Sequence, residues 1–163
     1  MTAVSDVDEA TLDLDWFAID KDHALGHFTT GGLGFLPRGA ASSREVLEML
    51  TAFFCGRPRI IGSAVVNPNV CAWARLKKGQ EDRYLEDFVA MAERGLFSYD
   101  HVPTGRGASH YFRVAAPTTP LALDQVPDEI RQALQAMVLP KVAFALDEEI
   151  PVSALDEDCA HKT

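Results

Sequence analysis

The sequence predicts an α+β domain with a mostly antiparallel sheet and about three helices packed on it. Strand-like segments form two candidate β-hairpins, one joining residues 14–19 to 25–30 and one within residues 96–115. Three further segments carry apolar residues at helical spacing. The regular strand–helix alternation of a doubly wound parallel sheet is missing, which favours the α+β class.

Length and composition are those of a globular protein. The chain has 163 residues, of which 47% are hydrophobic and 24% charged, so it can bury one core without disulfides or metals. We expect a single domain over 1–163, with flexible acidic ends at about 1–11 and 147–163. The formal net charge of −9 argues against nucleic acid or an anionic membrane as the partner.

A glycine-rich run follows the first hairpin. Gly31, Gly32 and Gly34 disfavour a regular strand there. Backbone N–H groups in such a run can face an anion, but the run matches neither common phosphate-binding pattern. The apolar residues 35–37 that follow favour packing instead.

The first helix has the clearest boundaries. Ser42 or Ser43 can cap its start, and Ser42 with Glu45 predicts a capping box. Apolar residues then recur at helical spacing until Gly56 and Pro58, which end the helix.

The middle of the chain is less regular. Segments 60–61 and 64–66 are candidate strands, whereas 70–76 fits either a helix or a strand. A second helix is predicted over about 80–94, because Gly95 follows its last apolar residues.

The last third of the chain predicts three elements. The second hairpin, within 96–115, has a long tip. A third helix is expected from Pro127 or Asp128 to Met137, since proline and acidic residues suit the first turn. Residues 142–146 are a candidate last strand.

The cysteines and the N-terminus indicate a cytoplasmic protein. Cys55, Cys71 and Cys159 have no CxxC spacing, which argues against a zinc ribbon or a thioredoxin-like site. Cys55 lies in an apolar run and is expected to be a small buried side chain. The acidic N-terminus does not resemble a signal peptide, and no apolar stretch is long enough to span a bilayer. No cofactor is predicted.

The first candidate site lies in the N-terminal hairpin. Asp20, Asp22, His23 and His27 are close in sequence and are residue types that bind transition metals. Strand alternation separates His23 from His27, and no spaced motif fixes a ligand geometry. We therefore interpret Asp20 and Asp22 as turn formers and predict no metal, keeping Asp20 and His27 as candidate binding residues.

The second candidate site lies at the tip of the second hairpin. Arg106 stands between two glycines, where its guanidinium could meet a carboxylate or phosphate. Ser109 and His110 are adjacent, so on a strand they point to opposite faces and cannot act as a nucleophile and its base. Arg106 and His110 are candidate binding residues, and a solvated tip is the alternative.

The third candidate is Trp73, near Arg75 and Lys77. Tryptophan and arginine are enriched at interface hot spots, so Trp73 could anchor a partner, although a core position is the alternative. Other aromatic residues fall at positions consistent with burial: Trp16, Phe17, Phe53, Phe54, Phe88 and Phe112.

The opening of the chain carries a family resemblance. The string Trp16-Phe17-Ala18-Ile19-Asp20, followed by His27-Phe28, Gly31-Gly32 and Pro37, resembles uncharacterised small bacterial proteins that begin with a W-F-A-x-D hairpin and a glycine turn. Residues 95–100 resemble a recurring piece of the same sequences, whereas His23 stands where the pattern has glycine. The resemblance implies no catalytic residue. In size and charge such proteins are loosely similar to immunity proteins that neutralise toxins.

These observations lead to two functional hypotheses. The favoured one is a non-catalytic protein-binding module, immunity-like, that recognises a basic partner through electrostatic steering. The alternative is a small-ligand-binding protein or hydrolase-type enzyme in which His27, Arg106 and His110 converge with nearby acids in a cleft. A homodimer formed through an open sheet edge is compatible with either.

Overall fold

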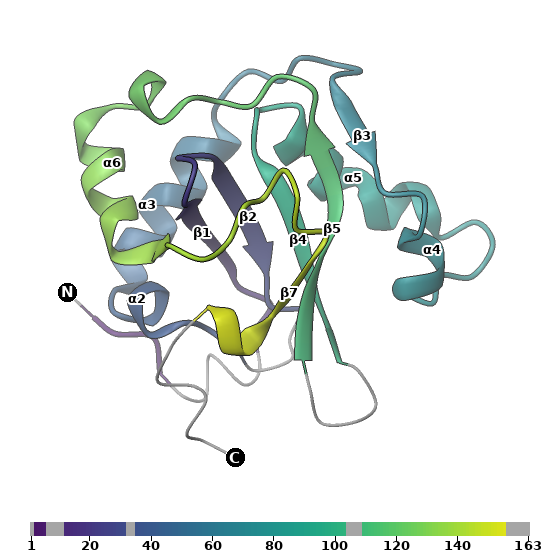
Figure 1. The fold of residues 1–163 in the computed structure, drawn as a ribbon, viewed down its shortest axis with the longest axis horizontal. Helices are drawn as coiled ribbons and strands as arrows, with labels where there is room; N and C mark the ends of the chain where they lie inside the picture. Colours follow the sequence, from purple (N-terminus) through teal and green to yellow (C-terminus); the bar gives the residue numbers. More distant parts are fainter. Residues whose placement is uncertain (1, 6–11, 32–34, 104–108, 156–163) are drawn as a thin grey trace.

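Seven strands form one mixed sheet through the centre of the molecule (Figure 1). The computed structural model describes residues 2–5, 12–31, 35–103 and 109–155. The strand order is β3-β5-β4-β2-β1-β6, and β7 also pairs with β5. The strands are β1 (Asp15–Asp20), β2 (Leu25–Thr29), β3 (Ala64–Val66), β4 (Phe97–Pro103), β5 (Ser109–Pro117), β6 (Val138–Leu139) and β7 (Glu149–Pro151).

The predicted fold class is confirmed. The described residues are 35% helix and 24% strand, and most strand pairs are antiparallel. The parallel pairs are β2 with β4 and β1 with β6. The helices of the described residues are α2 (Arg38–Ala41), α3 (Arg44–Cys55), α4 (Val70–Trp73), α5 (Glu81–Ala92) and α6 (Asp128–Leu134). Of these, α3, α5 and α6 correspond to the three predicted helices.

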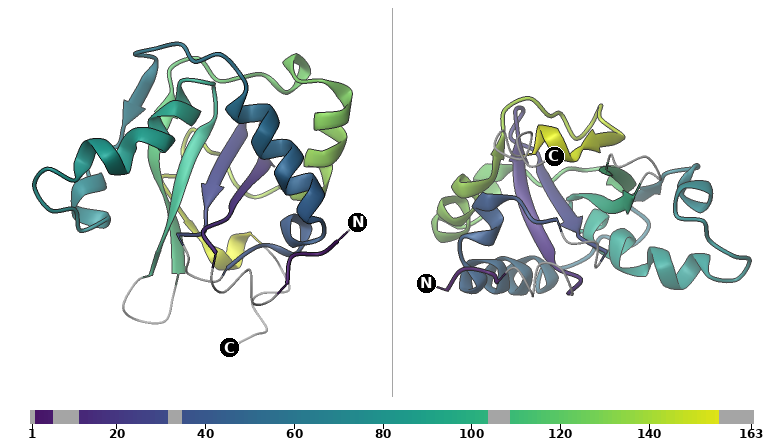
Figure 2. Two further views of the ribbon diagram at one scale, coloured as in Figure 1. Left: turned by 180° about the vertical axis from the view of Figure 1, so that it is seen from behind. Right: turned by 90° about the horizontal axis from the view of Figure 1, so that it is seen from below.

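The sheet separates two layers. Figure 2 shows α3 and α5 on one side of the strands and the C-terminal segment with β7 on the other. Because side chains alternate along a strand, Phe17 and Ile19 of β1 pack toward α3 and α6. Trp16 and Ala18 pack toward the C-terminal segment.

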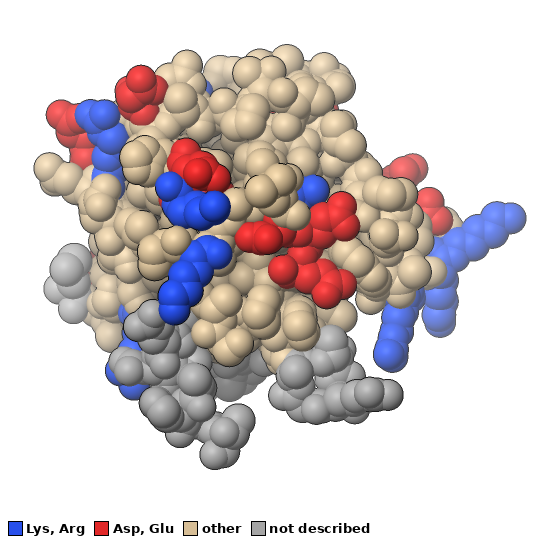
Figure 3. Space-filling view, in the orientation of Figure 1, with Lys and Arg blue, Asp and Glu red and all other residues tan. Residues whose placement is uncertain are grey.

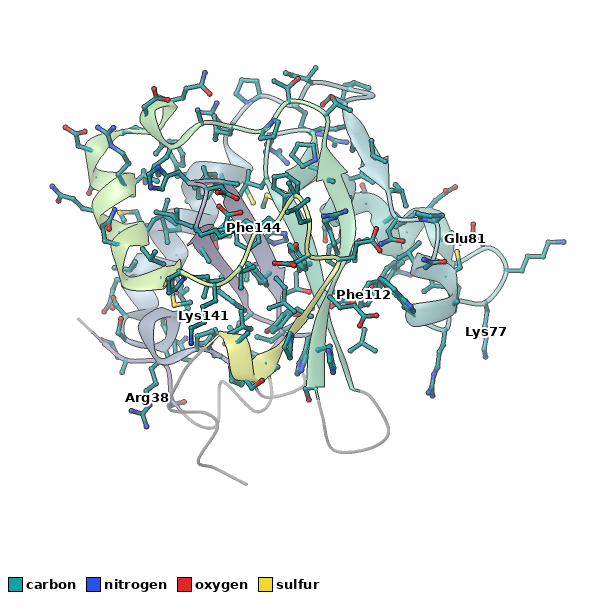
Figure 4. All side chains as sticks on the ribbon, viewed as in Figure 1. Arg38, Lys77, Glu81, Phe112, Lys141 and Phe144 are labelled. Carbon is teal, nitrogen blue, oxygen red and sulfur yellow. The ribbon has the colours of Figure 1, made fainter. Side chains whose placement is uncertain are left out.

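Aromatic rings fill the layer under the C-terminal segment. Phe28 stacks between Trp16 and Tyr99, with ring centroids 4.0 and 4.9 Å away. The indole N–H of Trp16 donates to the Tyr111 hydroxyl at 3.1 Å, so buried polar atoms of the two hairpins satisfy each other. Phe144 covers this cluster from the segment between β6 and β7 (Figure 4).

The start of α3 differs in detail from the prediction. Ser43 is the cap, and its Oγ accepts a hydrogen bond from the Val46 N–H at 3.2 Å. The predicted Ser42–Glu45 capping box is wrong, because the Ser42 hydroxyl donates to the Gly39 carbonyl instead. The Glu45 carboxylate accepts from the Thr2 N–H at 2.9 Å and ties the N-terminal segment to the helix. The predicted end at Gly56 is confirmed.

The predicted strand at 142–146 is wrong. Val142, Ala143 and Phe144 are buried, whereas Leu146 is exposed, and the backbone of the segment follows a turn. The Phe144 N–H donates to the Asp20 carboxylate at 2.7 Å, and the Ala143 N–H donates to the Asp147 carboxylate at 2.8 Å. Carboxylate side chains therefore accept the hydrogen bonds of backbone N–H groups that would pair with a neighbouring strand in a sheet.

The middle segment resolves into β3 and α4. The strand at 64–66 and the helical alternative for 70–76 are confirmed, whereas Ile60 and Ile61 form no strand and are 62% and 76% exposed. The expectation of a buried Cys55 is wrong, because its side chain lies at the exposed end of α3.

Parts of both acidic ends pack on the fold. Val4 is buried, and its N–H donates to the Ala41 carbonyl at 2.9 Å. Ile150 and Leu155 are also buried. Within the described ranges, no helix combines the length and apolar character required to cross a bilayer.

Candidate functional site

A groove of about 790 Å³ runs between α3 and α5 on the helical side of the sheet. Figure 2 shows the two helices from behind, with strands passing between them. The end of α3 and one face of α5 form its walls, and β1, β2 and β4 contribute to its floor. Five carboxylates line it: Asp13, Asp15, Glu86, Asp87 and Asp100.

Strand register explains why polar groups meet on the floor. In the pairing of β1, β2 and β4, His27 lies opposite Phe17 on one side and Ser98 on the other. Asp15 is two residues before Phe17 on β1, and Asp100 is two residues after Ser98 on β4. Because side chains alternate along a strand, both carboxylates lie on the same face of the sheet as His27.

His27 is held between two partners. Its Nδ1 lies 2.7 Å from the Ser98 hydroxyl, and its Nε2 lies 3.0 Å from the Asp15 carboxylate. The imidazole is only 1% exposed, and Ser98 is completely buried. A serine nucleophile must reach its substrate, so this Ser–His–Asp arrangement presents no accessible nucleophile. It orients Asp15, whose side chain is 39% exposed, toward the groove.

Asp100 joins β4 to β2 and α5. Its carboxylate accepts hydrogen bonds from the Thr29 hydroxyl at 2.9 Å and the Tyr84 hydroxyl at 2.5 Å. Burial raises the pKa of Asp100 above its usual value, although both hydrogen bonds oppose the shift. Burial, followed by the charge of Asp100, also raises the pKa of Tyr84. Asp100 is therefore an internal anchor at the groove floor.

Asp13 lies close to other negative charges. Burial raises its pKa, and the charges of Asp15 and Asp87 raise it further, against a lowering by the Gly31 N–H that donates to it at 2.9 Å. In the part of the chain that the structure describes, no lysine or arginine forms an ion pair with Asp13, Asp15 or Asp87. The groove thus concentrates negative charge.

The two arginines beside the groove are already engaged. Arg59 forms an ion pair at 2.7 Å with Glu93, which is nearly buried. Arg94 donates to three backbone carbonyls at 2.9 to 3.1 Å, those of Cys55, Arg57 and Ala90. Both guanidinium groups stabilise the loop after α3. They also line the groove, where the five carboxylates outnumber them.

No metal centre is found among the described residues, where no set of three or more His, Cys, Asp or Glu side chains could hold an ion.

Asp20 has a structural role. It is 1% exposed, and its carboxylate accepts from the backbone N–H groups of Asp22, Ala24 and Phe144 at 2.7 to 2.9 Å. This arrangement agrees with the turn-forming interpretation, and it leaves Asp20 little capacity to meet a ligand.

His110 is separated from His27. In the β4–β5 pairing His110 lies opposite Val102, four residues beyond the Ser98 that pairs with His27. Four residues correspond to about 13 Å along a strand, so the two imidazoles do not share a cleft. Arg106 lies outside the described residues.

Trp73 packs against the core. Its ring meets Phe112 edge to face, with centroids 4.9 Å apart, and it adjoins the cluster around Val70 and Phe88. Trp73 is half-buried and packs at the edge of this cluster. Figure 4 shows Phe112 on β5 beside α4.

Sequence patterns indicated His27 but not its neighbours in the groove. Asp15 could have been recognised from strand alternation, since it is two residues from the inward-facing Phe17. Ser98, Asp100 and Tyr84 reach the groove only through the parallel pairing of β2 with β4, which has no local sequence signal.

Comparison of the chain with protein-family models, curated protein sequences and solved structures gave no match. The groove is therefore interpreted from its own geometry and charge.

Proposed function

We propose that the protein is a non-catalytic protein-binding module for a basic partner, and that the groove between α3 and α5 receives a cationic side chain of that partner. One observation carries the proposal: Asp13, Asp15 and Asp87 line the same groove, and none of them forms an ion pair with a lysine or arginine among the described residues. The resemblance to immunity-type proteins implies a toxin-like protein as the class of partner.

The energetics of Asp13 support a cationic occupant. Its raised pKa reflects burial and repulsion from two carboxylates, both of which disfavour the ionised form. A guanidinium or ammonium group in the groove would reverse the repulsion and compensate the buried charge. Binding should therefore lower the pKa of Asp13 and weaken as salt is added.

The non-catalytic part of the proposal rests on burial. Ser98 is completely enclosed, and His27 has both ring nitrogens within hydrogen-bonding distance of protein groups. The hydrolase alternative requires an accessible nucleophile, and this arrangement does not supply one. The exposed carboxylates of the groove, such as those of Glu86 and Asp87, are acceptors suited to N–H donors.

The test uses a tetra-arginine peptide as the probe, titrated into isotopically labelled protein and followed by backbone amide shifts. We expect saturable shifts at groove residues and about tenfold weaker binding for the Asp13→Asn/Asp87→Asn variant, equivalent to about 1.4 kcal/mol. Asp13 and Asp87 are both exposed, and asparagine has the same size as aspartate, so this change should leave the fold intact.

The control removes the same charge from the opposite side of the sheet. Figure 3 shows acidic side chains near the middle of the face that carries the C-terminal segment. Glu148 and Glu149 are exposed in this segment, so Glu148→Gln/Glu149→Gln should leave the affinity nearly unchanged. Equal weakening by both double variants would mean that only net charge matters, and the proposal would be abandoned.

A further inference from the structure

A second groove, more apolar than the first, continues along α3. It has a volume of about 390 Å³ and is lined by one face of the helix, including Leu47, Thr51 and Ala52, and by Leu14 from the chain before β1. Asp13 and Asp15 line this groove as well as the acidic one. The two grooves therefore meet along the same two residues.

Helix geometry fixes the relation between the two grooves. The apolar groove meets α3 over residues 44–52, and the acidic groove meets it at Cys55. From the middle of the first stretch to Cys55 is about 10 Å along the helix axis. An extended peptide covers that distance in about three residues.

We infer that the two grooves form one channel for an extended segment of a basic protein partner, with an aliphatic side chain in the apolar groove and a cationic one, about three residues away, in the acidic groove. This inference rests on the proposed function and specifies the segment that the module recognises.

Charge complementarity selects this occupant. Three carboxylates, those of Asp13, Asp15 and Glu48, line the apolar groove together with one guanidinium, that of Arg44. Acidic groups therefore outnumber basic ones at this groove, which favours a segment that carries positive charge. Residues 6–11 of this chain contain three acids and no lysine or arginine, and a second copy of the chain carries a net charge of −9. Both would be repelled by the same carboxylates.

Burial of an aliphatic side chain in the apolar groove would add affinity that persists at high salt. Exposed ion pairs contribute little affinity and are screened by salt, whereas burial of apolar surface persists at high ionic strength. The charged contact would then set orientation and encounter rate, and the apolar contact would prolong the complex.

The test compares three capped peptides, Arg-Gly-Gly-Leu, Arg-Gly-Gly-Ser and Ser-Gly-Gly-Leu, by amide-shift titration. The arginine–leucine peptide should bind about tenfold more tightly than either of the others. Ala52→Gln fills the apolar groove from an exposed position of α3, so it should reduce the arginine–leucine peptide to the affinity of the arginine–serine peptide. Ala72→Gln, at an exposed alanine of α4, is the matched control and should change nothing.

The outcomes separate the two proposals. If leucine adds no affinity, or if Ala52→Gln has no effect while Asp13→Asn/Asp87→Asn still weakens arginine binding, the channel is wrong and the acidic groove stands. If arginine binding is insensitive to Asp13 and Asp87, the proposed function itself fails. Concentration-dependent self-association that competes with the peptide would identify a second copy as the occupant and overturn the inference.

Discussion

The carboxylate of Asp20 accepts a hydrogen bond at 2.7 Å from the backbone N–H of Phe144, a residue 124 positions further along the chain. Its other oxygen accepts from the N–H groups of Asp22 and Ala24 in the β1–β2 turn. One buried side chain thus closes the first hairpin and attaches the C-terminal segment to the sheet.

Asp20→Ala should lower the free energy of unfolding by about 3 kcal/mol, because it leaves three backbone N–H groups without their acceptor in a buried or half-buried site. Asp22→Ala, at an exposed position of the same turn, should change stability by less than about 0.5 kcal/mol. Urea unfolding of both variants measures the difference. Similar values for the two would show that Asp20 does not anchor the segment.

Gly95→Ala should be far more destabilising than Gly79→Ala. Both glycines have positive φ, +95° and +88°, which costs an alanine about 1–2 kcal/mol. A Cβ at Gly95 would also lie 2.6 Å from the backbone nitrogen of Leu121, whereas a Cβ at Gly79 would meet nothing within 4 Å. In thermal unfolding, the free energy of unfolding of Gly95→Ala should be at least about 2 kcal/mol lower than that of Gly79→Ala. Equal losses would mean that backbone conformation alone matters.

Tyr84→Phe should destabilise the protein by about 2 kcal/mol at pH 7, since it removes a hydrogen bond to the half-buried Asp100 carboxylate. The raised pKa of Asp100 means that its ionised form is the less favourable one in the folded state. The protonated Asp100 carboxyl therefore favours the folded state. Its contribution to stability is fully present below the unfolded-state pKa of 3.8 and is lost as the pH rises through the folded-state pKa. The effect of Tyr84→Phe should therefore shrink at pH 3–4, and a pH-independent loss in urea unfolding would contradict the role assigned to this bond.

His101 should make the fold less stable in mild acid. Burial lowers the pKa of His101 from 6.5, with partial compensation by the Thr30 carbonyl. As the pH falls below 6.5, His101 takes up a proton in the unfolded chain before it does so in the folded protein. The free energy of unfolding therefore declines until the pH has passed the folded-state pKa of His101. His101 Nε2 has no partner among the described residues, and the ring stacks on Tyr111 at 4.9 Å.

The comparison variant for this pH effect is His101→Phe, which keeps a ring on Tyr111 and removes the titrating group. The wild type should lose stability relative to His101→Phe between pH 7 and pH 5, measured by urea unfolding of both proteins. A constant difference over this range would exclude His101 as the source.

Local signals made much of the fold predictable. Both hairpins and α3 were expected because caps, turns and periodicity act within a few residues, as Ser43 and Gly56 show. The parallel pairing of β2 with β4 was not predictable, because about 70 residues separate partners such as His27 and Ser98. Residues 142–146 resemble a strand in sequence because they form an apolar run. Such a run does not reveal whether its backbone groups form hydrogen bonds with a neighbouring strand or with side chains.

The same distinction applies to the groove. His27 was a candidate from the start, but its environment depends on Ser98 and Asp100, which arrive from a strand far along the chain. The charge of Asp87 on α5 is one of the causes that raise the pKa of Asp13, and the two residues are far apart in the sequence. Groups brought together by long-range pairing have no local pattern, and only the folded chain reveals them.

The outer side of β5 has a wider consequence. β3 occupies it at residues 115–117 and β7 at residues 110–112, while the Arg113 N–H donates to Glu148 and the Val114 carbonyl accepts from Asn67. At the other end of the sheet, β6 covers β1 only at Ile19 and Asp20. Among the described residues, the outer side of β5 therefore leaves little backbone on which a foreign strand could grow. This edge should resist strand addition and fibre formation in crowded solutions for as long as the short strand β7 stays in place.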